Sequence, residues 1–510
     1  MSRENGVRFA TGPVITIMAV TTVLLLARCA RYDYFGDELY FLSAGRHLSP
    51  GYVDQGPLVP LLAHAAHSVA PGSLVVLRIS SILAGAAAIA VSAAIAREFG
   101  GDRAAQTLAA LAYATCPFLI TQTATLSTFA FDATLSATTI WLLIRWTRTR
   151  DDRLLFAATL IVALDVQVKL LAPVLLGTLA VGVVTAGPRN LLRRSALWMG
   201  LALVCVSAIP MAWWQHSHGW PQLAMGAVVD REQRAATGGV AGLPVQFALL
   251  AGLLGIPLLL NGLRALIVDV EWRRHRFVAI AAGADIVFIV AIDGRPYYFA
   301  SYLPALFAAG ATYALTTLRP WRSRASRGVL ACAVAVSAAV FVLIVGLLPL
   351  PASHLREPAD TQAEISLRMR LFGTSGWDRL VSAVTGAYRD LPADRREGTI
   401  VIAQTYWQAA ALDNLAGGPF SVYSPNRGFA LFGTPPPATT SALFVMIDGS
   451  ETTLRQSFSD ITALVHVDDR LGFPGIDRHV TIWRCERPTR PWSDIWADMT
   501  TDILDNRSLR

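Results

Sequence analysis

The sequence predicts a mainly α-helical protein that crosses a membrane many times and carries a small α/β domain at its C-terminal end. Its 510 residues are 54% hydrophobic and 15% charged, whereas charged residues make up roughly a quarter of an ordinary soluble protein. Apolar runs long enough to span a bilayer recur between residues 11 and 349, and charges and turn residues become frequent afterwards. We therefore expect a transmembrane domain at 1–350 and a second domain at 351–510.

The composition excludes several other classes. The net charge of +7 does not indicate a nucleic-acid partner, because the arginines separate apolar runs, as in the cytoplasmic loops of membrane proteins. The cysteines are scattered without a CxxC or Cys/His spacing, so neither a disulfide framework nor a zinc site is predicted. No metal ligand set is expected, although an acidic pair facing a phosphate could recruit a divalent cation.

A helix that spans the membrane needs ~20 predominantly apolar residues. This criterion predicts about eleven spans, near 11–30, 74–96, 104–120, 124–146, 154–169, 171–186, 196–214, 243–262, 277–292, 298–317 and 328–349. Residues 154–186 could alternatively form one long broken helix. The piece Leu58–Ala66 is too short to span, and we expect it to lie in the interface as an amphipathic helix.

The orientation follows from four arginine-rich loops, near 145–153, 189–194, 264–276 and 319–327. Such loops stay in the cytoplasm, so the N-terminus is expected inside. The first loop, 31–73, and the C-terminal domain then face outward from the cytoplasmic (inner) membrane. In that domain, Thr399–Ala403 and Ala442–Ile447 read as buried strands on either side of a helical stretch, Ala409–Leu415, which predicts an α/β arrangement.

Polar residues that are unusual for a membrane protein share the outer side of this topology. A charge at a helix centre costs at least ~2.5 kcal/mol and usually faces a partner or a cavity. A carboxylate can take a proton from an acceptor hydroxyl, and cations can stabilise a leaving phosphate. The convergence therefore indicates transfer of a group from an anionic donor. The candidates are Asp37, Glu38, Asp54, Gln55, Arg78, Asp132, Lys169, Arg295, Tyr297 and Tyr298.

The stretch from Phe35 to Leu48, followed by Gly51 to Leu58, resembles the first outer loop of family 39/83-like membrane glycosyltransferases. These belong to the C-type superfamily, with the protein O-mannosyltransferases and lipid A aminoarabinose transferases. Further stretches appear in the family's order at 78–85, 127–132, 214–221 and 294–298. The resemblance implies the C-type fold and an inverting transferase. Its partners would be a polyprenyl-phosphate sugar donor, a lipid, glycan or protein acceptor, and membrane lipids.

The resemblance also assigns roles to residues. It implies that Asp37 is the catalytic aspartate, supported by Glu38, and that Asp54 and Asp132 are acidic positions near the substrate. Relatives often have Lys or His followed by Pro-Pro-Leu where this chain has Gln55-Gly56-Pro57-Leu58. Gln55 can donate a hydrogen bond but supplies no charge. Lys169, Arg78 or Arg295 would then hold the phosphate, with Tyr297 and Tyr298 beside it.

Other interpretations of single residues stay open at this point. Asp37 could cap the next helix. Lys169, four residues after Asp165, could form a helical salt bridge with it. Arg78 could extend to the membrane interface, and Arg295 with its two tyrosines could anchor the chain there.

Two other functions also stay open for the whole chain. The first is a transporter or lipid-sugar flippase, whose binding groups would lie near the bilayer midplane. The second is a catalytically inactive relative, suggested by Gln55-Gly56.

Overall fold

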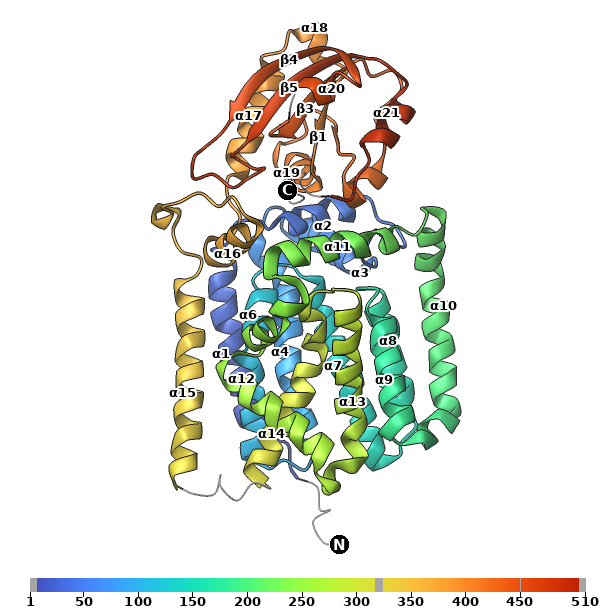
Figure 1. Ribbon diagram of the computed structural model, residues 1–510, viewed down its shortest axis with the longest axis vertical. Coiled ribbons are helices and arrows are strands. Elements are labelled where there is room, and N and C mark those ends of the chain that lie inside the picture. Colours follow the sequence, from blue (N-terminus) through green and yellow to red (C-terminus); the bar gives the residue numbers. More distant parts are fainter. Residues whose placement is uncertain (1–6, 317–323, 450, 504–510) are drawn as a thin grey trace.

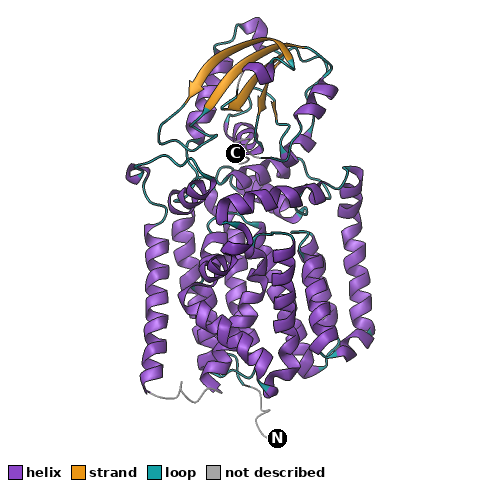
Figure 2. Ribbon diagram, viewed as in Figure 1, coloured by secondary structure: helices purple, strands orange, loops and turns teal. Residues whose placement is uncertain are grey.

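The computed structural model describes residues 7–316, 324–449 and 451–503, and consists of a helical bundle with a sheet-containing domain at one end (Figures 1 and 2). Helices α1 and α15 run along the long axis of the bundle (Figure 1). The bundle helices are α1 (Thr11–Cys29), α4 (Leu74–Glu98), α5 (Arg103–Ala114), α6 (Pro117–Gln122), α7 (Thr128–Thr149), α8 (Arg153–Val166), α9 (Ala172–Ala186), α10 (Ser195–Ser217), α12 (Leu243–Val268), α13 (Arg276–Ala291), α14 (Leu303–Thr316) and α15 (Arg324–Leu347).

Each predicted span contains a helix, and residues 154–186 form two helices, α8 and α9, rather than one. The count of eleven spans is not confirmed. Among the described residues, 5 helices are long and apolar enough to cross a membrane: Thr11–Cys29, Leu74–Glu98, Ser195–Ser217, Gly239–Val268 and Gly328–Leu347. Helices α5, α8, α9, α13 and α14 contain only 12, 14, 15, 16 and 14 residues. Residues 317–323, which include part of the fourth basic loop, lie outside the described residues.

Small residues let the bundle helices approach closely. A side chain on Gly262 of α12 would put its Cβ 2.2 Å from the carbonyl oxygen of Leu306, and one on Gly310 of α14 would put it 1.9 Å from that of Leu258. These two helices therefore cross with their backbones in contact, the packing that small residues provide between membrane helices.

Three further helices lie between the bundle and the sheet domain (Figure 1): α2 (Gly36–Arg46), α3 (Leu58–Val69) and α11 (Pro221–Thr237). Helix α3 has 12 residues and covers the predicted short apolar piece. Nine of the residues of α2 are buried, from Gly36 and Glu38 through to Gly45. A helix buried on nearly all sides must pack against more than one layer, and α2 does so.

The C-terminal domain is built on a five-stranded sheet of order β2-β1-β3-β5-β4. Strand β1 is parallel to β2 and β3, whereas β5 is antiparallel to β3 and β4. Its elements are α16 (Gln362–Phe372), α17 (Trp377–Arg389), α18 (Ala393–Arg396), β1 (Thr399–Ala403), α19 (Tyr406–Leu415), β2 (Val422–Tyr423), β3 (Ser441–Ile447), α20 (Glu451–Leu454), β4 (Phe458–Val467), β5 (Val480–Pro488) and α21 (Trp492–Met499).

The structure confirms both predicted strands and the helix between them. Strands β2, β4 and β5 were not predicted. Strand β2 has only 2 residues, and β4 and β5 include exposed or charged residues and lack the continuous apolar run of β1 and β3.

The hydrophobic core of the C-terminal domain continues into the first loop of the chain. Leu39 of α2 and Val59 of α3 belong to the same buried cluster as Trp377, Leu380 and Leu443 of the domain. Burial of a large apolar side chain stabilises the folded state by about 1.5–3 kcal/mol. The shared cluster therefore fixes the C-terminal domain against α2 and α3.

Candidate active site

Asp37 lies in the first turn of α2, where the C-terminal domain meets the bundle. Its Oδ1 accepts hydrogen bonds from the Tyr406 hydroxyl at 2.7 Å and the Trp407 indole N–H at 2.9 Å, both from the start of α19. The other oxygen, Oδ2, accepts no hydrogen bond from the residues that the structure describes. Gly36 makes this arrangement possible, since a Cβ there would lie 2.1 Å from the Trp407 ring.

The surroundings of Asp37 suit a proton acceptor. Burial raises the pKa of its carboxyl above the ordinary value, although the hydrogen bonds from Tyr406 and Trp407 act in the opposite direction. A raised pKa makes the carboxylate a stronger base. Asp37 does not cap α2: Phe35 is the N-cap residue, and the carboxylate that accepts its backbone N–H is that of Glu38, at 2.9 Å.

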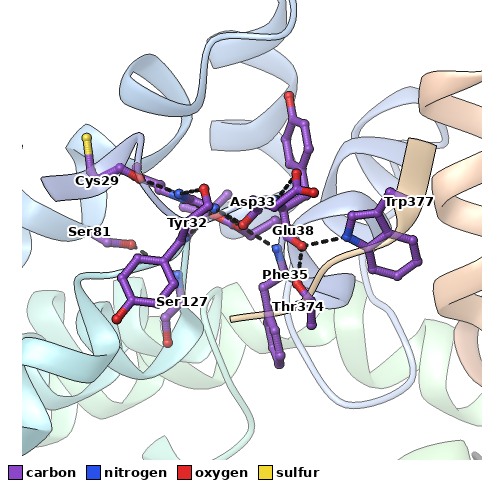
Figure 3. Close-up of polar contacts among 12 residues, drawn as sticks. Cys29, Tyr32, Asp33, Phe35, Glu38, Ser81, Ser127, Thr374 and Trp377 are labelled. Atoms are coloured by element: carbon purple, nitrogen blue, oxygen red, sulfur yellow. Dashed lines mark hydrogen bonds and ion pairs between the residues drawn. The ribbon is translucent and has the colours of Figure 1, made fainter. Parts of the chain in front are cut away.

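Glu38 and Arg78 form a fully buried ion pair. Figure 3 shows Glu38 together with Cys29, Tyr32 and Asp33, whose backbone also surrounds this pair. Arg78 Nη2 lies 2.6 Å from Glu38 Oε2, and Nε donates to Oε1 at 2.8 Å. The remaining N–H groups of Arg78 donate to the carbonyl oxygens of Cys29, Tyr32 and Asp33. A guanidinium has five N–H donors, and all are used. Glu38 also accepts the Leu126 N–H at 2.7 Å.

This pair changes the expected roles of both residues. Glu38 was expected beside the reaction and Arg78 on the phosphate or at the interface, but the side chains of both are 0% exposed and engaged by protein groups. Removing one partner of such a pair typically costs about 3–5 kcal/mol. The structure therefore places Glu38 and Arg78 as supports that join α2, α4 and the end of α1.

Lys169 lies in the turn between α8 and α9, beside the segment that carries Asp54 and Gln55. Its Nζ is 3.3 Å from Asp54 Oδ2 and 4.6 Å from the centre of the Phe129 ring, a distance at which a cation is attracted to the ring face. Asp165, the alternative partner suggested by helical spacing, instead accepts the Ser136 hydroxyl at 3.0 Å. The structure thus brings Lys169 and Asp54 together, a pairing that the sequence did not predict.

Gln55-Gly56 is accommodated by the backbone of the same turn. Gln55 forms an antiparallel bridge with Lys169, and the Gly56 N–H donates to the Val168 carbonyl at 3.1 Å. A Cβ on Gly56 would lie 2.2 Å from the carbonyl oxygen of Gln167. The Gln55 side chain is buried, and its Nε2 has no partner among the described residues. Glycine therefore lets this segment lie directly against the turn that carries Lys169.

Arg295 is held by Glu232 of α11. Its Nη2 lies 2.7 Å from Glu232 Oε2, and the other oxygen of Glu232 contacts Arg427 of the C-terminal domain. Arg427 in turn lies 5.3 Å from the centre of the Tyr406 ring. One carboxylate thus joins two guanidiniums from distant parts of the chain, next to the tyrosine that holds Asp37.

The two predicted tyrosines lie on the same side of the molecule as Lys169. The rings of Tyr297 and Tyr298 are 4.4 and 6.0 Å from that of Phe129, and both are half-buried. Both tyrosines therefore pack on a neighbouring aromatic ring. Phe129 therefore connects the tyrosine pair to the cation of Lys169.

Asp132 lies deeper in the bundle, in α7. It is 3% exposed, and its Oδ1 has no partner among the described residues. With Asp285 of α13, Tyr298 and Tyr302 it lines a cavity of about 10 Å³, roughly the space that one water needs. Tyr298 lines this cavity and also packs on Phe129, so it links Asp132 to the residues around Lys169.

Four residues of this site were missed by sequence reasoning: Glu232, Tyr406, Trp407 and Arg427. Tyr406 and Asp37 are 369 positions apart, and no local pattern relates them. Only Glu232 could have been suspected from the sequence, because it lies in a charged stretch, Asp230-Arg-Glu-Gln-Arg234, of a mostly apolar chain. Within residues 7–316, 324–449 and 451–503, no group of three or more His, Cys, Asp or Glu side chains is placed to hold a metal ion.

The fold described above is similar to that of several solved structures, and a family model matches part of the sequence. Residues 54–214 match the family model of the dolichyl-phosphate-mannose-protein mannosyltransferases, which confirms the resemblance seen in the sequence. Among solved structures, the chain is similar to ArnT from Cupriavidus metallidurans in the apo state, with a TM-score of 0.63 and 15% identity over 93% of this chain and 98% of that one.

The other solved relatives share less of their length with this chain. The arabinofuranosyltransferase AftD from Mycobacteria has a TM-score of 0.52 and 13% identity, over 94% of this chain and 40% of that one. The oligosaccharyltransferase AglB from Archaeoglobus fulgidus has a TM-score of 0.52 and 14% identity, over 81% and 64%. No curated protein matches the sequence.

Proposed function

We propose that the chain is an inverting glycosyltransferase that moves a sugar from a polyprenyl phosphate to an acceptor hydroxyl. The observation that carries this function is the carboxylate of Asp37, held through Oδ1 by Tyr406 and Trp407 with Oδ2 unengaged by described residues. Structures of relatives add support: one of ArnT is bound to undecaprenyl phosphate, and that of AglB contains a dolichol-phosphate.

The proposed reaction uses Asp37 as the base and nearby cations on the leaving group. Oδ2 of Asp37 takes the proton of the acceptor hydroxyl as its oxygen attacks the anomeric carbon. The bond from that carbon to the phosphate oxygen breaks, and the polyprenyl phosphate leaves with the electron pair. Attack opposite the leaving group inverts the anomeric centre. Lys169 and Arg295 stabilise the negative charge that grows on the phosphate.

We further propose that the reaction takes place on the outer face of the cytoplasmic membrane, by a bundle of about eleven spans at 1–350. The four arginine-rich loops support a cytoplasmic position for the opposite end of the bundle. The C-terminal domain, 351–510, is then extracytoplasmic. Asp37 lies in the layer between bundle and domain, whereas a transporter or flippase would have its binding groups near the midplane.

A transfer assay on the purified full chain in lipid tests this function. A panel of radiolabelled polyprenyl-phosphate sugars is supplied, and label is followed into water or into a membrane extract. We expect release from at least one donor by the wild type and about 10²–10⁴-fold slower release by Asp37→Asn. If a folded wild-type protein releases label from no donor, the transferase proposal fails and an inactive relative or a flippase replaces it.

A further inference from the structure

A second cavity, of about 100 Å³, lies where the C-terminal domain meets the first outer loop and the end of α10. A single water needs roughly 10–15 Å³, so the cavity has room for several non-hydrogen atoms, the size of one sugar ring. Its walls come from α2, residues 47–53, α10 and the 3₁₀ segment η7 (Arg427–Phe432). The residues that matter here are Tyr40, His47, Ser49, Tyr52, Trp214 and Phe432.

Aromatic rings form much of the wall and are held rigidly. The Phe432 ring is stacked with that of Tyr40, with centres 5.6 Å apart, and with that of His47, with centres 4.9 Å apart. The Trp214 ring lies 6.5 Å from that of Tyr52. The Tyr52 hydroxyl donates to the Ala44 carbonyl at 3.0 Å and accepts the Ser49 N–H at 3.1 Å. The faces of such rings are electronegative, and the C–H groups of a sugar ring complement them.

The polar groups of the cavity suit a neutral, hydroxyl-rich ligand. The His47 ring nitrogens and the Ser49 hydroxyl have no hydrogen-bond partner in the described part of the chain, so they can serve as donors and acceptors. No Lys, Arg, Asp or Glu among the described residues lines the cavity. In an aromatic pocket, a small number of polar groups is enough to fix the orientation of a ligand. Because no cationic side chain among the described residues lines the cavity, a phosphate is a less suitable ligand.

The cavity is one side chain away from the proposed base. Tyr40 follows Asp37 by about one turn of α2, and its ring lies 5.5 Å from that of Tyr406. The Tyr406 hydroxyl donates to Asp37. The cations assigned to the donor phosphate, Lys169 and Arg295, belong to other segments and are not in the cavity wall.

We propose that this cavity binds a neutral sugar ring of the acceptor, which makes the acceptor a glycan or glycolipid rather than a polypeptide. This inference rests on the proposed transferase function. The ring is held between aromatic faces, with its hydroxyls on His47 and Ser49, and the hydroxyl to be glycosylated extends toward Asp37.

Binding to the full chain in lipid nanodiscs tests the cavity without depending on turnover. The probes are methyl α-mannopyranoside, methyl β-galactopyranoside and methyl β-glucuronide, read by saturation-transfer NMR. We expect saturable binding of at least one neutral glycoside and weaker binding of the charged glucuronide. His47→Ala and Phe432→Leu should weaken it about tenfold, the loss of one or two hydrogen bonds or of a ring contact. Leu48→Ala, an exposed neighbour outside the cavity wall, should leave it unchanged.

The outcomes separate this inference from the proposed function. Absence of saturable binding by both neutral glycosides, or equal binding by the cavity variants at unchanged thermal stability, overturns the cavity assignment. A transfer assay on the same preparations then shows whether donor hydrolysis exists at all. If the donor is hydrolysed but the cavity binds no sugar, the proposed transferase function is retained and the acceptor site in this cavity is rejected. Transfer to a Ser/Thr peptide that is unaffected by His47→Ala would also overturn it.

Discussion

At the scale of single residues, Asp37 is a carboxylate whose two oxygens have different surroundings. Oδ1 is occupied by two donors from the C-terminal domain, which fixes the orientation of the side chain. Oδ2 is therefore presented in one direction, as a general base requires. Glu38, its neighbour in sequence, has no free oxygen, because both of its carboxylate oxygens accept hydrogen bonds from Arg78 or from backbone N–H groups.

The substitution Asp37→Asn separates chemistry from folding. Its amide oxygen can still accept from Tyr406 and Trp407, but it cannot take a proton. We expect transfer to fall about 10²–10⁴-fold, the usual contribution of a general base. Burial raises the pKa of Asp37, so the ionised group destabilises the fold at neutral pH, and the variant should unfold at the same or a higher temperature. A lower unfolding temperature, measured in detergent, would contradict this account.

Tyr406→Phe tests the same carboxylate through its pH dependence. The hydrogen bond from Tyr406 lowers the pKa of Asp37, so its removal should raise that pKa further. Because the ionised form is the base, activity is lost as pH falls through this pKa. The acid limb of the kcat/KM profile should therefore move to higher pH.

The matched control for Tyr406→Phe is Tyr388→Phe, whose hydroxyl donates to the Arg396 carbonyl elsewhere in the domain. Its acid limb should coincide with that of the wild type. An unmoved acid limb in Tyr406→Phe would mean that Asp37 is not the group being titrated.

At the scale of elements, the pairing of residues 55–56 with the α8–α9 turn positions Lys169. Gly56→Pro would remove the N–H donated to Val168 and place ring atoms against the Gln167 carbonyl. We expect a loss of at least ~3 kcal/mol of stability, seen as a large fall in thermal unfolding temperature. Gly177→Ala, where a Cβ meets nothing within 4 Å, is the control. A Gly56→Pro protein as stable as the wild type would show that this pairing does not form.

At the scale of the whole molecule, the C-terminal domain shares one core with helices α2 and α3. Leu443 of β3 is 0% exposed and lies in the cluster that contains Leu39 of α2. We expect Leu443→Ala to cost about 2–5 kcal/mol and to speed hydrogen exchange in α2 as well as in the sheet. Leu367→Ala, which is 57% exposed, should do neither. Unchanged exchange at residues 36–46 in a destabilised domain would refute the shared core.

The sequence by itself determined the helices and two buried strands of the C-terminal domain, and it predicts that the polar residues share one side of the membrane. These follow from apolar periodicity and loop charge, which act over neighbouring residues. It also indicated Asp37, Asp54 and Lys169 as candidate residues. It did not establish the number of spans, because helices such as α5 and α8, with 12 and 14 residues, are shorter than a bilayer crossing.

Only the tertiary structure decided which polar residues are free to react. Glu38 and Arg78 look as available as Asp37 in the sequence, yet they satisfy each other in a buried pair. Tyr406, Trp407 and Arg427 belong to an unremarkable part of the C-terminal domain until α19 is packed on α2. The physical reason is that hydrogen bonding and burial depend on contacts between segments hundreds of residues apart, which no local pattern of residues records.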